Sequence, residues 1–310
     1  MKQAIWMVLA SLCFSAMGVC IKFATSDFGI AELIAYRGGL SAIIVYGMMR
    51  WRGESIRTPY PVLHVQRSVI GVLSLATWFY AISGLPLSTA MTLNYMSSIW
   101  LAAFLIGGAF LLRFANTSNN TISNTGANSA SAPTHDFDIM NSAMIATVVI
   151  GFAGVGLILR PTIEQNQLWY GFVGLLSGIG AAVAYMQVAA LGRVGEPELR
   201  IVFYFSIGAT LVGLIGTLFD GFTALSWRGI GWLVPMALLA VGGQVLMTRA
   251  YSQGATITAA CLQYSGVLFG AIFGVWIFDD ALNWQSWLGM VMIVMSGIFA
   301  TALGMKRFRP

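Results

Sequence analysis

Residues 81–95 read A-I-S-G-L-P-L-S-T-A-M-T-L-N-Y, and residues 250–264 repeat the pattern without a gap as A-Y-S-Q-G-A-T-I-T-A-A-C-L-Q-Y. Each copy ends in an amide followed by a tyrosine, Asn94-Tyr95 in the first and Gln263-Tyr264 in the second. Both pairs are embedded in apolar sequence typical of buried helices, where polar groups without partners are costly. The repeat therefore predicts two related helices that each carry a polar pair into the interior.

The composition places the chain in a membrane. Of its 310 residues, 58% are hydrophobic and only 9% are charged, and the mean hydropathy is +0.80. A soluble domain carries about a quarter charged residues. The net charge of +5 does not indicate nucleic-acid binding, because the basic residues punctuate apolar runs and form no patch. Cys13, Cys20 and Cys261 lie in apolar stretches without ligand spacing and are expected to be packing residues.

Ten stretches are long and apolar enough to cross a bilayer, which takes about 20 helical residues each. We expect an all-α polytopic membrane protein with ten transmembrane helices, near residues 4–23, 31–49, 66–84, 87–112, 140–159, 169–191, 199–219, 229–250, 256–278 and 284–304. Most connections span only a few residues, so sequential helices are expected to be antiparallel neighbours.

The basic residues predict the orientation, because cytoplasmic loops are enriched in Lys and Arg. With both termini in the cytoplasm, only Lys22, Arg160 and Arg228 fall on the opposite side. The cytoplasmic side then holds Lys2, Arg50, Arg52, Arg57, Arg67, Arg113, Arg193, Arg200, Arg249, Lys306, Arg307 and Arg309.

Residues 113–139 form a polar insertion between the fourth and fifth predicted helices. Its centre, N-T-S-N-N-T-I-S-N-T-G-A-N-S-A-S-A-P-T at 116–134, is of low complexity and too polar to bury a core. We expect a flexible cytoplasmic loop, where the two matches to the glycosylation pattern carry no meaning.

The repeat divides the chain into two halves of five helices. The first repeat covers residues 1–112 and 140–165, and the second covers 166–310. A weaker correspondence superposes Ser11 on Ser177 and Glu32 on Glu198. An odd number of helices makes the second half enter the membrane from the opposite side, which is the inverted-repeat arrangement of secondary transporters.

The chain resembles the drug/metabolite transporter superfamily, in its ten-helix EamA-like family. The matching stretches are W-F-Y-A-I-S-G-L-P-L-S-T-A-M-T-L (78–93), R-A-Y-S-Q-G-A-T-I-T-A-A-C-L-Q-Y-S-G-V-L-F-G-A-I-F-G-V-W-I-F-D-D (249–280), A-Y-R-G-G-L-S-A (35–42) and S-W-L-G-M-V-M-I-V-M-S-G-I (286–298). The resemblance implies a secondary carrier in a bacterial inner membrane that exports amino acids or other small metabolites. Where the family usually has Gly-Glu, the chain has Leu112-Arg113 and Asp279-Asp280.

The two polar pairs are the first candidates for a substrate site. At 1.5 Å per helical residue, Asn94-Tyr95 and Gln263-Tyr264 lie about 10–12 Å deep from opposite faces, so they are expected to line one cavity. Hydrogen bonds between helices by buried amides are an equally good interpretation.

Arg37 lies inside the second predicted helix and is expected to attract a substrate carboxylate. An ion pair with Asp27 or Glu32, or extension of the side chain to the outer surface, is the structural alternative. Further substrate-binding candidates at cavity depth are the aromatic residues Trp78, Tyr80 and Trp100 and the hydroxyl of Ser97, although aromatic residues at helical spacing more often serve packing.

Absences narrow the mechanism. The acidic residues fall in loops or at helix ends, and His64 and His135 fall in connections, so a proton relay through a carboxylate in the membrane core is not expected. The sequence has no nucleotide-binding loop, metal-ligand cluster or nucleophile elbow, so we expect neither a cofactor nor an enzyme.

A membrane enzyme acting on lipid and a non-transporting sensor or subunit are the alternatives to a transporter. The expected partners are a small metabolite and the bilayer, without nucleic acid, for a monomer or homodimer.

Overall fold

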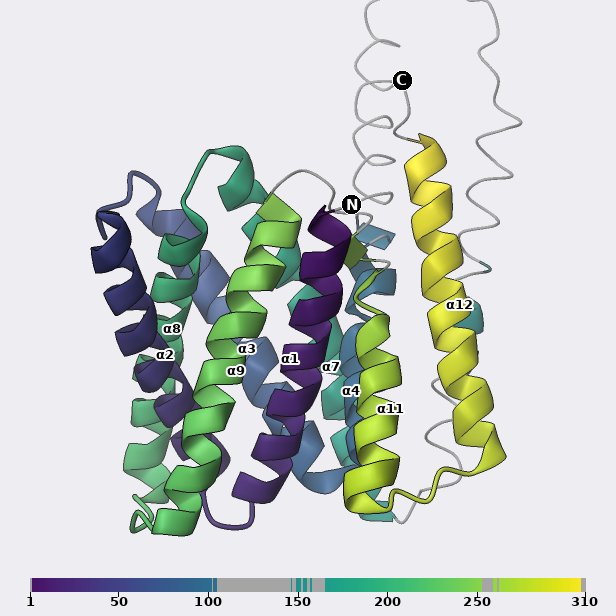
Figure 1. Ribbon diagram of the computed structural model, residues 1–310. Helices are drawn as coiled ribbons and strands as arrows, with labels where there is room; N and C mark the ends of the chain where they lie inside the picture. Colours follow the sequence, from purple (N-terminus) through teal and green to yellow (C-terminus); the bar gives the residue numbers. More distant parts are fainter. Residues whose placement is uncertain are drawn as a thin grey trace, which may run out of the picture.

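The computed structural model describes residues 2–101, 165–252 and 262–307, together with isolated residues between them (103, 104, 146, 149–151, 153, 154, 157, 259 and 260). Within these residues the secondary structure is helical and contains no strand (Figure 1). The helices are α1 (Lys2–Ala24), α2 (Ile30–Arg52), α3 (Pro61–Gly84), α4 (Leu87–Tyr95), α7 (Gln165–Arg193), α8 (Glu198–Asp220), α9 (Trp227–Ser252), α11 (Ser265–Phe278) and α12 (Trp284–Arg307).

Six helices of the described part are long and apolar enough to cross a membrane: α1, α2, α3, α7, α8 and α9. They follow one another in alternating directions along the bundle (Figure 1). The expectation of an all-helical, multi-pass membrane protein is confirmed at this level. The predicted insertion at 113–139, and all but isolated residues of the predicted helix at 140–159, lie outside the described residues.

The beginning of α1 and the end of α12 lie at the same end of the bundle, which we call the proximal end (Figure 1). The distal end holds the beginnings of α2, α4 and α9. A left-handed glycine ends α2 at the proximal end: Gly53 has φ 68° and donates its N–H to the carbonyls of Met49 and Arg50. Such a glycine C-cap satisfies carbonyls that the last helical turn leaves open.

Helix α3 begins at Pro61, rather than near residue 66 as predicted. Proline is pre-organised for the first helical position, where its missing N–H costs nothing. The earlier start brings His64 into the helix and places Arg67, at the edge of the predicted segment, beyond the first helical turn; both are buried. The prediction that His64 lies in a connection was therefore wrong.

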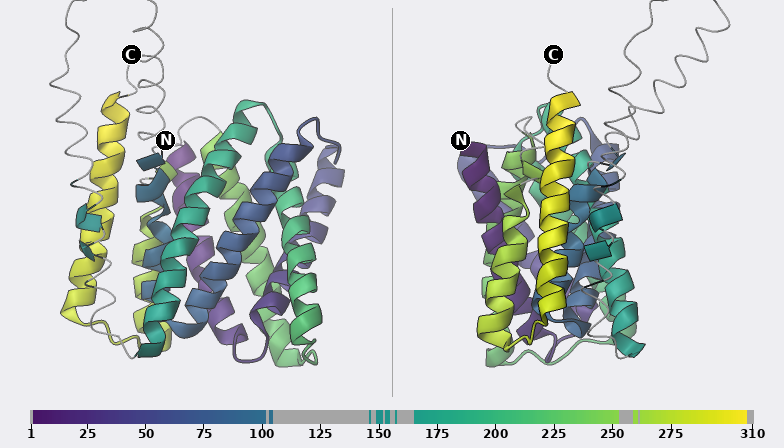
Figure 2. Two further views of the ribbon diagram at one scale, coloured as in Figure 1. Left: turned by 180° about the vertical axis from the view of Figure 1, so that it is seen from behind. Right: turned by 90° about the vertical axis from the view of Figure 1, so that its right-hand side faces the viewer.

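The helices pack mainly across the two halves of the chain. The most extensive pairings are α2 with α8, α1 with α9, α3 with α7 and α4 with α11. Figure 2 shows α1 to α4 interleaved with α7 to α11 rather than standing as a separate bundle. The hydrophobic core accordingly draws buried residues from both halves, for example Met17 and Phe79 with Phe205 and Met236.

Helices α4 and α11 approach closely because one face of α11 carries only small residues. A Cβ atom at Gly266 would lie 2.2 Å from Tyr95 Cζ, and one at Gly270 would lie 2.9 Å from Met91 Cβ. The small-xxx-small pattern of α11 thus seats the side chains of α4 against the α11 backbone.

Both copies of the sequence repeat coincide with a short interruption of the regular helical hydrogen-bond pattern, which we call a break; the backbone stays in the right-handed helical region there. Helix α4 ends at Tyr95, and Met96 (φ −58°, ψ −13°) starts a turn before helical residues resume at Ser97. In the second copy, Gln263 and Tyr264 (φ −63°, ψ −17°) form the turn that precedes α11. Serine hydroxyls satisfy carbonyls at the second break, with Ser98 donating to Ala260 at 2.8 Å.

Candidate functional site

A cavity lies inside the bundle between the two halves. Its volume of about 60 Å³ leaves room for a few water molecules. Its lining comes from α1, α2, α3, α4, α7, α8 and α9: Phe14, Met17, Arg37, Arg67, Gly71, Ser74, Leu75, Trp78, Asn94, Tyr95, Ala181, Ala184, Tyr185, Phe205, Gln244 and Met247.

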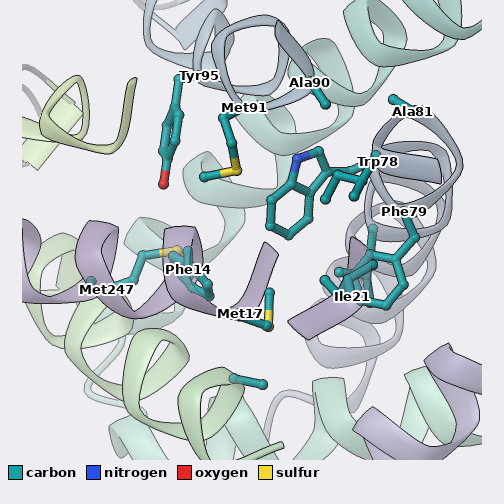
Figure 3. Packing of buried hydrophobic residues seen from close by; sticks show 14 of the residues in the cluster. Phe14, Met17, Ile21, Trp78, Phe79, Ala81, Ala90, Met91, Tyr95 and Met247 are labelled. Atoms are coloured by element: carbon teal, nitrogen blue, oxygen red, sulfur yellow. The ribbon is translucent and has the colours of Figure 1, made fainter. Parts of the chain in front are cut away.

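The first polar pair lines this cavity. The Asn94 side-chain amide donates to Ser177 Oγ at 3.0 Å, which joins α4 to α7. Tyr95 lies 3% exposed, with its ring against Gly266 of α11. In Figure 3, Tyr95 and Trp78 point from α4 and α3 toward the interior that Phe14 and Met17 of α1 enter from the other side.

The second polar pair lies beside the cavity and does not line it. Gln263 is 1% exposed, and its amide makes three hydrogen bonds to side-chain hydroxyls. Its Oε1 accepts from the Tyr251 hydroxyl at 2.8 Å, and its Nε2 donates to Tyr185 at 3.1 Å and to Ser97 at 3.3 Å. Tyr185 lines the cavity, so one side chain separates Gln263 from it. Tyr264, 4% exposed, occupies the turn that precedes α11.

Arg37 lies in the cavity wall and is 2% exposed. Its guanidinium lies over the ring of Phe205 on α8, 5.5 Å from the centroid. The alternative of an ion pair with Glu32 is not formed: Glu32 instead accepts the backbone N–H of Thr223 at 3.2 Å.

Arg67 is a cavity residue that sequence reasoning missed, because it was counted among the cytoplasmic charges. It is 3% exposed, lines the cavity, and lies 4.3 Å from the centroid of the same Phe205 ring. The signal that identifies it is Pro61, because a helix starting there carries Arg67 well past its first turn.

Of the remaining candidates, only Trp78 lines the cavity, with an indole N–H that has no acceptor among the described residues. Tyr80 stacks on Tyr170 with ring centroids 4.7 Å apart. Ser97 accepts the hydrogen bond from Gln263, and Trp100 packs beside Phe104 at 6.2 Å. These three side chains support the walls from outside the cavity.

The chemistry of the lining is that of a binding site rather than a reaction centre. Within the described ranges, no three His, Cys, Asp or Glu side chains gather closely enough to hold a metal ion. The described lining contains two cations, several neutral polar groups and aromatic rings, without a carboxylate. Such a surface can bind and orient a polar molecule that carries negative charge.

Comparison with known proteins adds a family and named relatives. Residues 168–302 match the model of the EamA-like transporter family. The pseudopaline exporter CntI of Pseudomonas aeruginosa is 30% identical over 299 residues, covering 94% of this chain and 93% of that protein. An uncharacterized transporter of Helicobacter pylori is 24% identical, covering 94% and 91%. A riboflavin transporter of Rhizobium johnstonii is 22% identical, covering 99% and 93%.

One crystal structure shares the fold of this chain over 99% of both chains, with a TM-score of 0.65. The sequence identity is 16%, so this likeness concerns the fold alone.

Proposed function

Because this chain belongs to the EamA-like transporter family of the drug/metabolite transporter superfamily, we propose that it is a secondary carrier that exports a small polar or zwitterionic metabolite by alternating access. Its relatives are named as transporters, and the chain itself is a multi-pass membrane transporter rather than an enzyme. The direction of transport follows the relative that is named an exporter.

The observation that carries the mechanism is the pair of helix breaks beside the cavity. Discontinuous helices at the interface of inverted repeats are typical of the substrate sites of secondary transporters. Here the breaks fall at Met96 and at Gln263-Tyr264, in the two copies of one sequence motif. The proposed repeats are residues 1–112 with 140–165, and residues 166–310.

The pattern of helix packing supports the same two halves. Superposing the first half on the second matches α1 to α7, α2 to α8, α3 to α9 and α4 to α11. Under this exchange the pairing α1–α9 becomes the pairing α3–α7, and both are extensive. The pairings α2–α8 and α4–α11 map onto themselves. Ser11 and Ser177, which the sequence superposed, each contact the motif of the other half: Ser11 donates to the Gln263 carbonyl, and Ser177 accepts from Asn94.

We assign the substrate contacts to Arg37, Trp78, Asn94 and Tyr95, which line the cavity. Gln263 is assigned to positioning, because it holds the cavity residue Tyr185 by a hydrogen bond. Tyr264 lies beside it at the second break, and Ser97, Tyr80 and Trp100 lie outside the cavity lining. A further consequence of the proposal is that the two breaks move in turn as the cavity opens to one side and then to the other.

The proposed location is a bacterial inner membrane with both termini in the cytoplasm. The proximal end of the bundle carries most of the described basic residues near helix termini, among them Arg50, Arg52, Arg193 and Arg200. Facing the cytoplasm with this end satisfies the bias of Lys and Arg toward cytoplasmic loops.

Flux across liposomes reconstituted with the full chain tests this function. We expect counterflow of at least one compound from a panel of small polar metabolites, and a decrease of ten-fold or more in Tyr95→Phe with normal insertion. Measurements with and without a pH gradient test whether protons are coupled. Absence of flux for the whole panel contradicts the transport function, and unchanged flux in Tyr95→Phe contradicts the placement of the site.

A further inference from the structure

Two buried arginines meet at one aromatic ring inside the cavity. The guanidinium carbons of Arg37 and Arg67 lie 5.5 and 4.3 Å from the centroid of Phe205. Because both distances end on the same ring, the two cations are no more than about 10 Å apart. At such separations in a low-dielectric interior, like charges repel strongly, so this arrangement is unfavourable until an anion joins it.

No carboxylate in the described ranges neutralises either cation. The three ion pairs found there all involve Glu196 or Glu198 at the proximal end. The Nε atom of Arg37 and the Nε and Nη1 atoms of Arg67 have no acceptor among the described residues. Both side chains are more than nine-tenths buried. Charged donors kept in a membrane interior without a partner indicate a functional site.

The other polar groups of the described lining are uncharged, so none of them supplies a negative charge to the two arginines. Trp78 lines the cavity, and its buried indole N–H has no acceptor in the described part of the chain. The described lining offers no carboxylate that an ammonium group would need. The site is therefore complementary to an anion, and less so to a zwitterion.

Helix α3 is shaped to receive the Arg67 guanidinium. A Cβ atom at Gly71, one turn further along α3, would lie 1.8 Å from Arg67 Nη1 and 3.0 Å from Phe205 Cε2. The missing side chain leaves the space in which the guanidinium lies between its own helix and the ring. The position of this charge is thus fixed by two elements, α3 and α8.

We infer that the substrate is an organic anion with two carboxylates, one bound by Arg37 and the other by Arg67, with its carbon chain against the aromatic residues between them. One carboxylate would leave one buried cation uncompensated, whereas two match the two planar donor forks. This inference rests on the proposed transport function and narrows its substrate from a polar or zwitterionic metabolite to a net anion.

A matched set of probes tests the substrate class on the full chain in detergent and in liposomes. Glutarate, valerate and δ-aminovalerate share a chain length and differ only in whether the far end is a carboxylate, a methyl or an ammonium group. Pimelate and heptanoate repeat the comparison at a longer spacing, and inorganic phosphate represents the other common dianion. Binding is measured by thermal stabilisation, and transport by counterflow.

We expect one or both dicarboxylates to bind at least ten-fold more tightly than their matched monocarboxylates and than δ-aminovalerate. Arg67→Gln is expected to remove this preference while Arg67→Lys retains part of it. Arg249→Gln is the matched control, because Arg249 also lies over an aromatic ring, Trp6 at 4.2 Å, but is 45% exposed and outside the cavity. If Arg67→Gln fails to insert, the wild-type comparison still decides the substrate class.

Equal or tighter binding of the monocarboxylate or the zwitterion, binding of neither dicarboxylate, or a preference for phosphate overturns the inference. So does an undiminished dicarboxylate preference in Arg67→Gln. These results are separable from a failure of the transport function. Counterflow of any compound without a dicarboxylate preference overturns only the substrate class, whereas tight dicarboxylate binding without counterflow of any compound overturns only transport.

Discussion

Gln263 shows how one side chain can be both a packing residue and part of a transport site. Its amide holds three hydroxyls, from Tyr251, Tyr185 and Ser97, and so ties the second helix break to the cavity wall. The two interpretations of the polar pair that the sequence left open are therefore compatible. Asn94 plays the corresponding part at the first break, where it donates a hydrogen bond to Ser177.

Replacing Gln263 with alanine is expected to lower both stability and flux. The change leaves buried hydroxyls without their partner, at a cost of about 1–3 kcal/mol for each unsatisfied group. Thermal melting in detergent and counterflow in liposomes measure the two effects. Gln66→Ala is the control, because Gln66 is an exposed glutamine of α3. A Gln263→Ala protein with wild-type flux would show that the second break takes no part in transport.

Substitution of Gly71 by alanine is expected to weaken substrate binding by ten-fold or more while the protein still inserts. The added methyl group occupies the space of Arg67 Nη1, the end of a flexible side chain that can move aside. Binding is followed by the thermal stabilisation that the substrate produces. Gly47→Ala in α2 is the control, because a Cβ atom there meets nothing within 4 Å. Equal effects of the two changes would contradict the assigned position of Arg67.

Some residues of the cavity can be recognised from the sequence, and others cannot. Arg37 and Asn94 were identified because a charge or amide within an apolar helix is conspicuous whatever surrounds it. Arg67 was missed because its assignment depends on where α3 begins, and helix starts are the least certain part of such a prediction. The partners of Gln263 come from three other helices, so no local pattern indicates them.

At the scale of elements, the described helices follow the predicted segments closely, but the two breaks were not predicted. The sequence around Met96 contains neither Gly nor Pro, so it predicts an unbroken helix. Contacts with other helices accompany the break instead. Ser98 donates to Ala260 at the second break, and Ser11 of α1 donates to the Gln263 carbonyl at 3.4 Å.

The contact between α4 and α11 predicts that Gly266→Ala lowers the melting temperature and abolishes most counterflow. The new methyl group would overlap the Tyr95 ring, which is 3% exposed and has little room to move. Gly39→Ala in α2 serves as the control, because its Cβ atom would meet Thr210 Cγ2 at an ordinary 3.8 Å. Wild-type melting of Gly266→Ala would mean that the two helices separate more readily than their packing indicates.

Asp280, at the distal end of α4 and α11, predicts that the stability of the protein depends on pH. Burial raises the pKa of Asp280, although Lys22 and the backbone N–H groups of Leu87 and Ser88 at the start of α4 oppose the shift. A raised carboxyl pKa means that the fold favours the protonated form, so its contribution to stability is present at low pH and is lost as pH rises through that pKa.

Melting curves of Asp280→Asn are accordingly expected to depend less on pH in the acidic range than those of the wild type. Asp279→Asn is the matched control, because Asp279 is the exposed neighbour in a left-handed conformation, φ 50°, that asparagine also adopts. The same pH dependence in wild type and Asp280→Asn would assign the titration to another group.

At the scale of the whole molecule, a buried polar cluster near the proximal end joins two of the helices that line the cavity. Glu196, 5% exposed, accepts a hydrogen bond from Thr58 in the loop before α3 and pairs with Arg200 of α8 at 2.8 Å. His64 of α3 lies 3.6 Å from the same carboxylate. The cluster thus fastens α3 and its preceding loop to α8, two elements that both line the cavity.

Loss of this carboxylate is expected to loosen α3 from α8 and to open the cavity toward the proximal end. In a chain whose native cysteines are replaced, a cysteine at Ala184 in the cavity wall should react several-fold faster with an impermeant thiol reagent after Glu196→Ala. Asp220→Ala, an exposed change at the distal end, is the control. An unchanged labelling rate would show that another contact closes the proximal side.

The pairing of helices across the two halves has a consequence for biosynthesis. Helices α1, α2 and α3 have their main partners in α9, α8 and α7, which the ribosome makes later. The first half is therefore made before Phe205, the ring that contacts both Arg37 and Arg67. At that stage its buried polar groups lack the partners that the second half supplies. Such long-range pairing slows assembly and leaves an intermediate open to misassembly and degradation.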